Sequence, residues 1–304
     1  MSAIKNVCVI GLGTMGMGAA KSCIKAGLNT YGGDISDKAL ETLKEAGAVK
    51  VSKTPKEFAS ELDAVLVLVV NAAQVRSVLF GDNPEDCLAS ALKKGTPVMV
   101  SSTMAASDAK DIGEKLASYG LPMLDAPVSG GAVKANIGEM TVMASGDPAT
   151  FEALKPLLDA VAGKVYNIGS EIGLGASVKI VHQLLAGVHI AVAAEAMAMA
   201  AKAGIPLDIM YDVVTNAAGN SWMFENRMKH VLEGDYTPLS AVDIFVKDLG
   251  LVTDTAKAMH FPIPLASTAF SMFTSASNAG YGRWDDSAVI KIFNGITLPE
   301  EKKH

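Results

Sequence analysis

Three polar side chains, Lys179, His182 and Gln183, stand close together in an otherwise apolar segment. Residues three and four apart share one face of a helix, so these side chains lie together if the segment is helical. We expect partial desolvation and the dipole of the helix start to lower the pKa of the Lys179 ammonium. A lysine near neutrality can exchange a proton with a substrate oxygen, which indicates acid–base catalysis. The alternative for Lys179 is a surface lysine whose stem covers apolar residues.

A second cluster offers groups that bind an anion. The segment 125–131 reads Asp-Ala-Pro-Val-Ser-Gly-Gly, in which the hydroxyl of Ser129 is followed by Gly130 and Gly131. A hydroxyl and unobstructed backbone N–H groups together can hold a carboxylate. Taken alone, the segment would be an ordinary turn after a strand.

The third chemical feature is a glycine-rich turn near the start of the chain. The residues are Gly11, Leu12, Gly13, Thr14, Met15 and Gly16. In this spacing the first glycine permits a tight turn, the second lets the backbone approach a pyrophosphate, and the third lets helix and strand pack closely. The turn follows an apolar strand and opens a helix whose N-terminus favours phosphates, which is the context that supports a dinucleotide site.

Asp34 ends the second expected strand, 18 residues after Gly16. Dinucleotide-binding folds place an acidic residue near this position, where it accepts hydrogen bonds from the adenosine ribose and repels a 2′-phosphate. Asp34 therefore predicts NAD rather than NADP. The alternative is an aspartate that only caps the turn.

The elements that must position these residues change in character along the chain. From residue 6 to about 168, short β-branched runs alternate with helical segments, which is typical of βαβ units. We expect strands at 7–10, 29–33, 64–70, 97–101, 122–126, 140–144 and 165–168, and helices at 15–26 and 38–46. The sequence thus predicts an α/β fold with a Rossmann-type, mostly parallel sheet in residues 1–168. An all-helical domain follows in residues 169–304, joined by a long helix over 176–203.

Composition excludes several other classes of protein. The 304 residues carry a formal net charge of −6 without a basic block, so we expect no nucleic-acid partner. Three separated cysteines and five scattered histidines predict neither a disulfide framework nor a metal site. The N-terminus lacks the features of a signal peptide, and the apolar segment 184–201 contains His189 and Glu195, so we interpret it as a buried helix. We expect a soluble cytoplasmic protein that does not associate with a membrane.

The glycine turn, the segment 125–131, the helix lysine and the later segment 247–251 (Lys-Asp-Leu-Gly-Leu) occur in the order found in β-hydroxyacid dehydrogenases, which the chain resembles over nearly its full length. The resemblance implies that Ser129, Gly130 and Gly131 hold the substrate carboxylate, that Lys179 is the catalytic acid/base, and that Lys247 lies by cofactor and substrate. Because ligands bind beyond the carboxyl ends of strands, we expect the nicotinamide between the domains, near Ser102 and Thr103.

Three segments, 69–75, 179–183 and 216–222, resemble a branch of this family that oxidises L-threonate at C2. We expect Val70 and Asn71 to lie by the cofactor. Asn216, Asn220, Ser221 and His182 could together hydrogen-bond a short polyol acid; the alternative for each is a structural role in a helix cap or a buried polar contact. The family usually has Asn where this chain has His182, which predicts a different or more hydroxylated substrate. His182 either orients the hydroxyl or helps to neutralise Lys179.

Two other functions remain open from the residues alone. One is a dehydrogenase of another 3-hydroxy acid, or a tartronate semialdehyde reductase, on the same scaffold. The other is an NAD-binding sensor without turnover. The resemblance also implies a homodimer or homotetramer joined through the helical domain.

Overall fold

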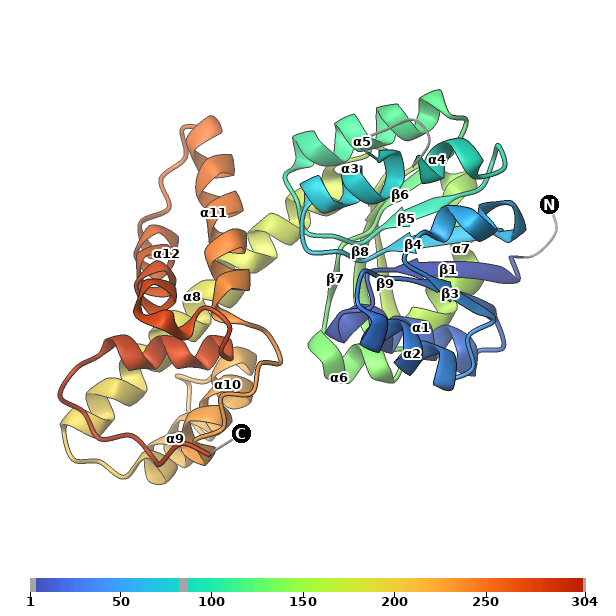
Figure 1. The fold of residues 1–304 in the computed structure, drawn as a ribbon. Coiled ribbons are helices and arrows are strands. Elements are labelled where there is room, and N and C mark those ends of the chain that lie inside the picture. Colours follow the sequence, from blue (N-terminus) through green and yellow to red (C-terminus); the bar gives the residue numbers. More distant parts are fainter. Residues whose placement is uncertain (1–3, 82–86, 303–304) are drawn as a thin grey trace. The chain divides into compact units, whose positions relative to one another are not determined.

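The computed structural model describes residues 4–81 and 87–302. The chain forms two compact units, residues 1–179 and 180–304 (Figure 1). An α/β unit followed by a helical one confirms the predicted fold class, and a long helix begins in the first unit and continues into the second. Each unit has its own hydrophobic core.

The first unit is built on one twisted sheet. Its strands are β1 (Asn6–Ile10), β2 (Asn29–Gly33), β3 (Lys50–Ser52), β4 (Ala64–Val67), β5 (Val98–Val100), β6 (Met123–Asp125), β7 (Val128–Ser129), β8 (Met140–Ser145) and β9 (Ala162–Gly169). The order is β3-β2-β1-β4-β5-β6-β8-β7, with β9 also paired to β8. The strands from β3 to β6 are parallel, whereas β8 runs antiparallel to β6 and β7. Two short strands, β3 and β7, were not predicted.

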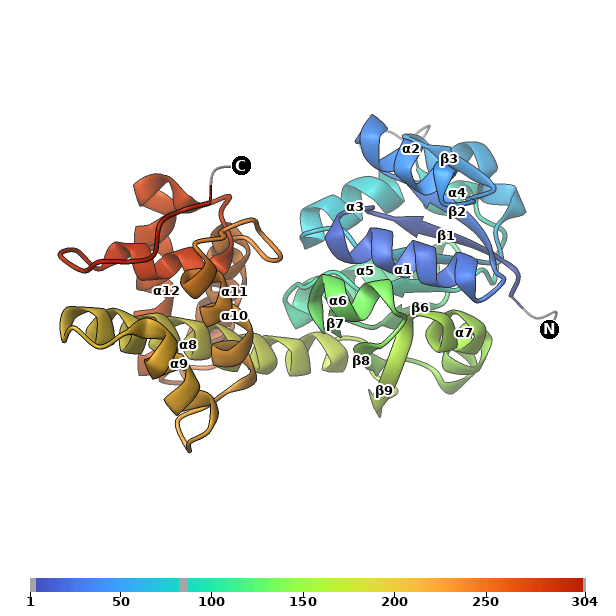
Figure 2. The ribbon, with the colours of Figure 1, turned by 90° about the horizontal axis from the view of Figure 1, so that it is seen from below.

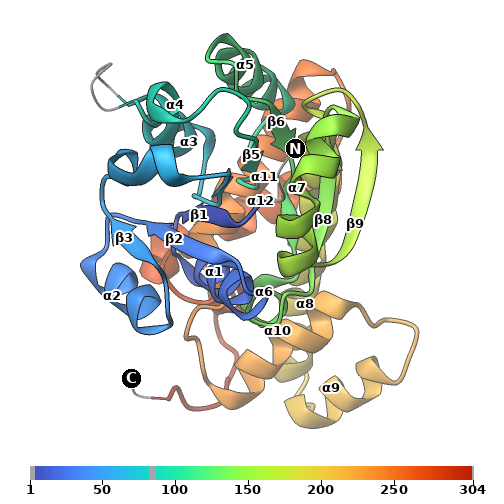
Figure 3. The same ribbon diagram turned by 90° about the vertical axis from the view of Figure 1, so that its right-hand side faces the viewer.

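Helices cover both faces of this sheet (Figures 2 and 3). They are α1 (Thr14–Lys25), α2 (Asp37–Glu45), α3 (Ala72–Phe80), α4 (Leu88–Ala91), α5 (Ala106–Ser118), α6 (Gly131–Asn136), α7 (Pro148–Val161) and the 3-10 helix η1 (Pro55–Glu61). Val7 and Val9 of β1 face the core that α1 and α7 share, while Cys8 and Ile10 face the core of α3 and α5. Because side chains alternate between the faces of a strand, a strand covered on both faces is apolar throughout.

The second unit is entirely helical apart from one isolated bridge, Ala241 to Asp285, among its described residues. Its elements are most of α8 (Leu174–Lys202), then α9 (Leu207–Thr215), α10 (Trp222–Glu233), α11 (Val242–Ala258), α12 (Pro264–Ala276), the π turn η3 (Ser277–Tyr281) and the 3-10 helix η4 (Asp286–Ile292). α8 and α11 approach closely where a Cβ on Gly187 would lie 2.8 Å from a methyl of Leu249.

α8 is the one described helix that is long and apolar enough to cross a bilayer, and half of its most apolar stretch is buried inside the structure. The buried residues include Ile190, Ala194 and Met197, which contribute to the core of the second unit. A buried core helix can be as long and as apolar as a membrane-spanning helix, so length and composition alone do not distinguish the two.

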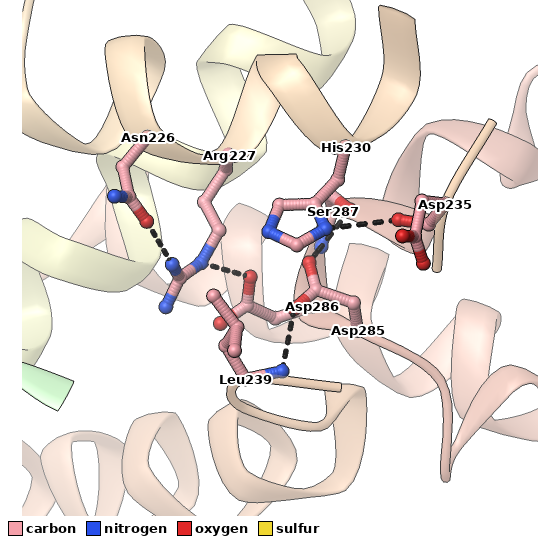
Figure 4. A network of polar contacts seen from close by, with 8 residues as sticks. All are labelled: Asn226, Arg227, His230, Asp235, Leu239, Asp285, Asp286 and Ser287. Carbon is pink, nitrogen blue, oxygen red and sulfur yellow. Dashed lines mark hydrogen bonds and ion pairs between the residues drawn. The ribbon is translucent and has the colours of Figure 1, made fainter. Parts of the chain in front are cut away.

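A buried polar network ties α10 to η4 (Figure 4). Arg227 donates from Nε to Asp286 Oδ1 at 2.6 Å and from Nη1 to Asn226 Oδ1. The neighbouring Asp285 accepts hydrogen bonds from Ser287 and from the backbone N–H of Leu239. Burial raises the pKa of Asp286 to about 7, with Arg227 acting in the opposite direction.

The pKa of Asp286 predicts how stability changes with pH. The unfolded chain loses this proton near pH 3.8 and the native state keeps it to about 7, so the native state binds more protons in this range. The contribution of Asp286 to the free energy of unfolding is therefore largest in acid and is lost as pH rises towards 7. The side chain of Asp286→Asn does not titrate, so the difference in free energy of unfolding between variant and parent should shift in favour of the variant as pH rises through this range. Urea denaturation of both proteins between pH 4 and 8 measures the difference; a constant difference would contradict the assignment.

Candidate active site

The glycine turn follows β1 and leads directly into α1. Gly11 has φ of +90°, and a Cβ there would lie 2.6 Å from the Leu68 carbonyl oxygen. A Cβ on Gly16 would lie 1.7 Å from the Gly11 carbonyl oxygen. Gly13, by contrast, is exposed and has nothing within 4 Å of its Cβ position. Two glycines are thus required by packing, and the third leaves open space at the helix start.

The N-terminus of α1 can receive an anion. Its N-cap, Gly13, has no side chain to accept from the first backbone N–H groups, and the first turn contains no acidic residue. Thr14 is exposed and Met15 is half-buried beside it, while Leu12 is buried in the core below. Free N–H groups and the helix dipole favour a phosphate at this end.

Two glycine substitutions separate packing from phosphate approach. Gly13→Ala should change the free energy of unfolding by less than about 1 kcal/mol, since its Cβ meets nothing and its φ of −63° suits any residue. It should nevertheless raise the Kd of NAD roughly tenfold or more, because the methyl group occupies the approach to the pyrophosphate. Gly16→Ala should destabilise the fold itself by about 1–3 kcal/mol. Thermal denaturation and calorimetric titration measure both; normal NAD affinity in Gly13→Ala would contradict this role.

Asp34 lies against the glycine turn. Its Oδ2 accepts from the Leu12 backbone N–H at 2.6 Å, and its Oδ1 accepts from the Ser36 N–H at 2.8 Å. The adjacent strands β1 and β2 are in register from Asn6 and Asn29 to Ile10 and Gly33. This pairing places the Asp34 carboxylate beside the glycine turn, although Asp34 comes 18 residues after Gly16 in the sequence.

The other predicted cofactor residues of this unit follow neighbouring strands. Val70 and Asn71 come after β4, and Ser102 and Thr103 come after β5. Since β1, β4 and β5 are parallel and adjacent, their carboxyl ends meet at one edge with the glycine turn. The structure therefore brings these residues to the edge where α/β sheets bind ligands.

Asn71 and Ser102 differ in their surroundings. Asn71 caps α3 by accepting from the Gln74 N–H at 2.9 Å, and Gln74 in turn accepts from the Val70 N–H at 2.8 Å. Ser102 is buried, and its hydroxyl has no hydrogen-bond partner among the described residues. The Asn71 side chain therefore stabilises a helix start, whereas the Ser102 hydroxyl is not used by the fold in this way.

The predicted carboxylate-binding segment lies between β7 and α6. Ser129 ends β7, which pairs antiparallel with β8. Gly130 and Gly131 have φ of +123° and +64°, two successive left-handed conformations that favour glycine. A Cβ on Gly131 would meet nothing within 4 Å, so its backbone can be approached closely.

One acidic side chain holds the start of α8, and the sequence alone did not indicate that role. Asp125 Oδ2 accepts from the backbone N–H groups of Gly173 and Ala176, each at 2.9 Å. The Ser145 hydroxyl donates to the same oxygen at 3.3 Å and accepts from the Gly175 N–H at 3.0 Å. Burial raises the pKa of Asp125, and the hydrogen bonds oppose that shift. Asp125 thereby joins the end of β6 to the N-terminus of the helix that carries Lys179.

Lys179 lies five residues beyond the first residue of α8 and is 6% exposed. Burial disfavours the charged form of an amine, as the proposed acid–base role requires. Gly175 allows this helix to approach the sheet, because a Cβ there would lie 2.6 Å from the Met143 carbonyl oxygen and 2.7 Å from that of Asp125. Lys179 and the segment Ser129–Gly131 belong to the same unit.

In the second unit, the predicted site residues Lys247 and His182 are connected by polar contacts through Asp248 and Gln183. Lys247 Nζ lies 2.7 Å from Asp248 Oδ1, and Asp248 Oδ2 accepts from Gln183 Nε2 at 2.5 Å. Gln183 Oε1 lies 2.9 Å from His182 Nδ1. Asp248 was quoted in the sequence only as part of a segment, and its pairing with Gln183 was not predicted.

Asn220 and Ser221 take part in the start of α10. Ser221 caps the helix by accepting from the Phe224 N–H at 3.0 Å, and Asn220 Nδ2 donates to Glu225 Oε1 at 3.0 Å. These contacts give both residues a structural role, which the sequence had left as the alternative.

Two further kinds of site, a metal centre and a disulfide, find no support in the described residues. Within residues 4–81 and 87–302, no three His, Cys, Asp or Glu side chains are grouped as a metal site requires. Cys8, Cys23 and Cys87 are buried and not joined in disulfides.

Comparison with known families matches the two parts of the chain separately. Residues 6–169 match the NAD-binding domain of 6-phosphogluconate dehydrogenase, and residues 173–293 match the NAD-binding domain described for NADP-dependent 3-hydroxyisobutyrate dehydrogenase.

Individual relatives match over nearly the full length. The chain is 72% identical to an L-threonate dehydrogenase of Pectobacterium atrosepticum, over 98% of this chain and 97% of that protein. It is 73% identical to an L-threonate dehydrogenase of Haemophilus influenzae, over 97% of both proteins. A crystal structure of 3-hydroxyisobutyrate dehydrogenase from Salmonella typhimurium superposes with a TM-score of 0.91 at 65% identity, covering 95% of this chain and all of that one.

Proposed function

The chain belongs to the 3-hydroxyisobutyrate dehydrogenase-like family, and we propose that it is the kind of member that oxidises L-threonate with NAD. The observation that carries this substrate is the identity of 71–73%, over nearly the whole chain, to four proteins of that activity. The chain is an oxidoreductase that acts on the CH–OH group of a hydroxy acid.

The first unit has the features that NAD requires. Gly13 leaves space for the pyrophosphate, the N-terminus of α1 offers N–H groups, and Asp34 presents a carboxylate for the adenosine ribose. The same carboxylate would repel the 2′-phosphate of NADP, which supports NAD as the cofactor. When bound, NAD supplies the acceptor for the hydrogen that leaves the substrate carbon.

The chain's own residues then bind the acid and move a proton. We assign the substrate carboxylate to Ser129 and to the backbone N–H groups of Gly130 and Gly131, which two left-handed glycines leave accessible. Lys179 takes the proton of the C2 hydroxyl as the carbonyl forms. Lys179 is buried on α8, where its side chain is shielded from water.

The remaining assignments follow the family resemblance. We place Lys247, Val70, Asn71, Ser102 and Thr103 by the cofactor. His182, Asn220 and Ser221 are assigned to the substrate, with the hydroxyls of a polyol acid as their partners.

A substrate screen tests the proposed function. NADH absorbance should rise fastest with L-threonate in a panel that includes D-glycerate and 3-hydroxyisobutyrate, each offered with NAD and with NADP. We include 3-hydroxyisobutyrate because the similar Salmonella protein of known structure is described as a 3-hydroxyisobutyrate dehydrogenase. A higher kcat/KM for 3-hydroxyisobutyrate would overturn the assigned substrate, and no reduction of either cofactor would favour a sensor without turnover.

We further propose a homo-oligomer formed through the second unit, in the cytoplasm. Leu185, Val192 and Met199 recur every seven residues on α8 and are 52%, 56% and 75% exposed. Apolar residues at this spacing form a seam along which two helices pack. A second copy of α8 would remove this seam from water.

Charges on the seam should dissociate the oligomer. We expect Leu185→Glu combined with Val192→Glu to convert it to monomer, because two carboxylates from each copy would be buried without partners. Val49→Glu is the matched control, since Val49 is equally exposed, at 51%, but lies in the first unit. Sedimentation velocity measures the mass of each protein; an unchanged mass in the double variant would contradict the seam.

A further inference from the structure

A chain of hydrogen bonds in the second unit fixes the orientation of one imidazole ring. Gln183 Nε2 donates to Asp248 Oδ2 at 2.5 Å, and Gln183 Oε1 lies 2.9 Å from His182 Nδ1. At the far end, Lys247 Nζ forms an ion pair with Asp248 Oδ1 at 2.7 Å. Asp248 is 2% exposed and Gln183 is 7% exposed, so water does not readily replace these contacts.

The chemistry of each member sets the direction of the hydrogen bonds. An ammonium such as Lys247 can only donate, and the carboxylate of Asp248 can only accept. The group of Gln183 that faces Asp248 must therefore be its NH2, which leaves the carbonyl oxygen facing His182. An amide oxygen only accepts, so Nδ1 of His182 must carry the proton. In the neutral ring, Nε2 is then the nitrogen with a lone pair.

We propose that Gln183 and Asp248 are positioning residues that hold His182 in this tautomer, and that its Nε2 accepts a hydrogen bond from a hydroxyl of the substrate other than the one oxidised. The inference rests on the proposed function and adds the basis of selection among hydroxy acids. His182 follows Lys179 by three residues on one helix face, a rise of about 4.5 Å. This separation places it along the substrate chain from the C2 hydroxyl that Lys179 deprotonates.

The tautomer itself can be measured without turnover. In protein labelled with 15N-histidine, long-range 1H–15N correlation in mildly alkaline buffer should show His182 protonated at Nδ1 alone, with His182→Asn identifying its signals. A wild-type ring protonated at Nε2, or at both nitrogens, would overturn the proposal.

Asp248→Asn should invert the tautomer. The positive charge of Lys247, which lies 2.7 Å from Asp248 Oδ1 in the parent, favours the amide oxygen over the amide NH2 on that side, so the NH2 will face Gln183. Gln183 must rotate to present its oxygen to that NH2, and its own NH2 will face His182 Nδ1. The proton of the ring then moves to Nε2. Retention of the Nδ1–H form in a folded Asp248→Asn protein would contradict the positioning role.

The kinetic consequence should depend on the substrate. With Nε2 converted from acceptor to donor, kcat/KM for L-threonate should fall roughly tenfold, since a polar group left without its partner costs about 1–3 kcal/mol. The matched substrate is 2-hydroxybutyrate, which has the same four carbons and the C2 hydroxyl but no hydroxyl at C3 or C4. Because Asp248 also pairs with Lys247, Asp248→Asn can slow both substrates, so the measure is the ratio of the two kcat/KM values, which should fall roughly tenfold against L-threonate.

The results that would contradict the role of His182 can be distinguished from those that would contradict the proposed function. An equal fall for both substrates would mean that His182 serves the reacting hydroxyl, which overturns the selectivity role. If L-threonate is not oxidised by the wild type, the proposed function fails, whereas the 15N spectra still decide whether Gln183 and Asp248 set the tautomer.

Discussion

Lys179→Ala should lower kcat for L-threonate by roughly a thousandfold, within the range of about 10²–10⁴ that a positioned acid or base contributes. The residue is 6% exposed on α8, whose start is bound to the sheet through Asp125. Removing the amine removes the group assigned to take the hydroxyl proton. Stopped-flow or steady-state NADH absorbance measures the loss, and calorimetric titration should give an unchanged Kd for NAD.

Two further variants test whether Lys179 acts by proton transfer or by charge. Lys179→Arg keeps a positive charge but cannot lose its proton, so it should be about as inactive as the alanine variant. Lys164→Ala, an exposed lysine of β9 in the same unit, should retain full activity. The pH profiles of kcat for the wild type and for the alanine variant should differ, because the variant lacks the group assigned to proton transfer. Near-normal turnover in Lys179→Ala would remove the acid–base assignment.

Asp34→Asn should reduce the preference for NAD over NADP by roughly a hundredfold. A hydrogen bond to a charged group contributes about 1.5–3 kcal/mol, so loss of the charge weakens the contact with the ribose of NAD. The same change removes repulsion of a 2′-phosphate. The expected measurement is the ratio of kcat/KM for NAD to that for NADP, both with saturating L-threonate.

The structure supplies the control for Asp34. The asparagine oxygen can still accept from the Leu12 N–H, which the carboxylate now does at 2.6 Å, so the bond to the glycine turn is kept, while the bond from the Ser36 N–H is lost. Asp34→Ala removes that bond as well and should lower thermal stability in addition. An unchanged cofactor ratio in both variants would show that Asp34 only stabilises the turn.

The sequence predicted elements well where a local pattern determines them. Strand β2 has the predicted limits, and α1 and α8 begin within two residues of those expected. β4 ends three residues early, at Val67, because the chain beyond it passes close to Gly11. The strands β3 and β7, with three and two residues, are too short to produce a recognisable alternation.

Interactions between distant segments could not be predicted in the same way. The glycine turn and Asp34 lie within one βαβ unit, whose geometry is common to many proteins. The contacts of Asp125 join residues 48 and 51 positions apart, and Gln183 meets Asp248 across 65 positions. No periodicity in the sequence records such pairings, since they depend on how α8 packs against the sheet in one unit and against α11 in the other.

The close approach of α8 and α11 at Gly187 has a consequence for the evolution of substrate choice. Gly187 is one turn beyond Gln183, and Leu249, which a Cβ at 187 would touch, is next to Asp248. Any larger residue at 187 would displace the Leu249 side chain, beside the 2.5 Å bond between Gln183 and Asp248. A position with no side chain, and no contact with any ligand, can thus restrict which acids a descendant of this protein is able to use.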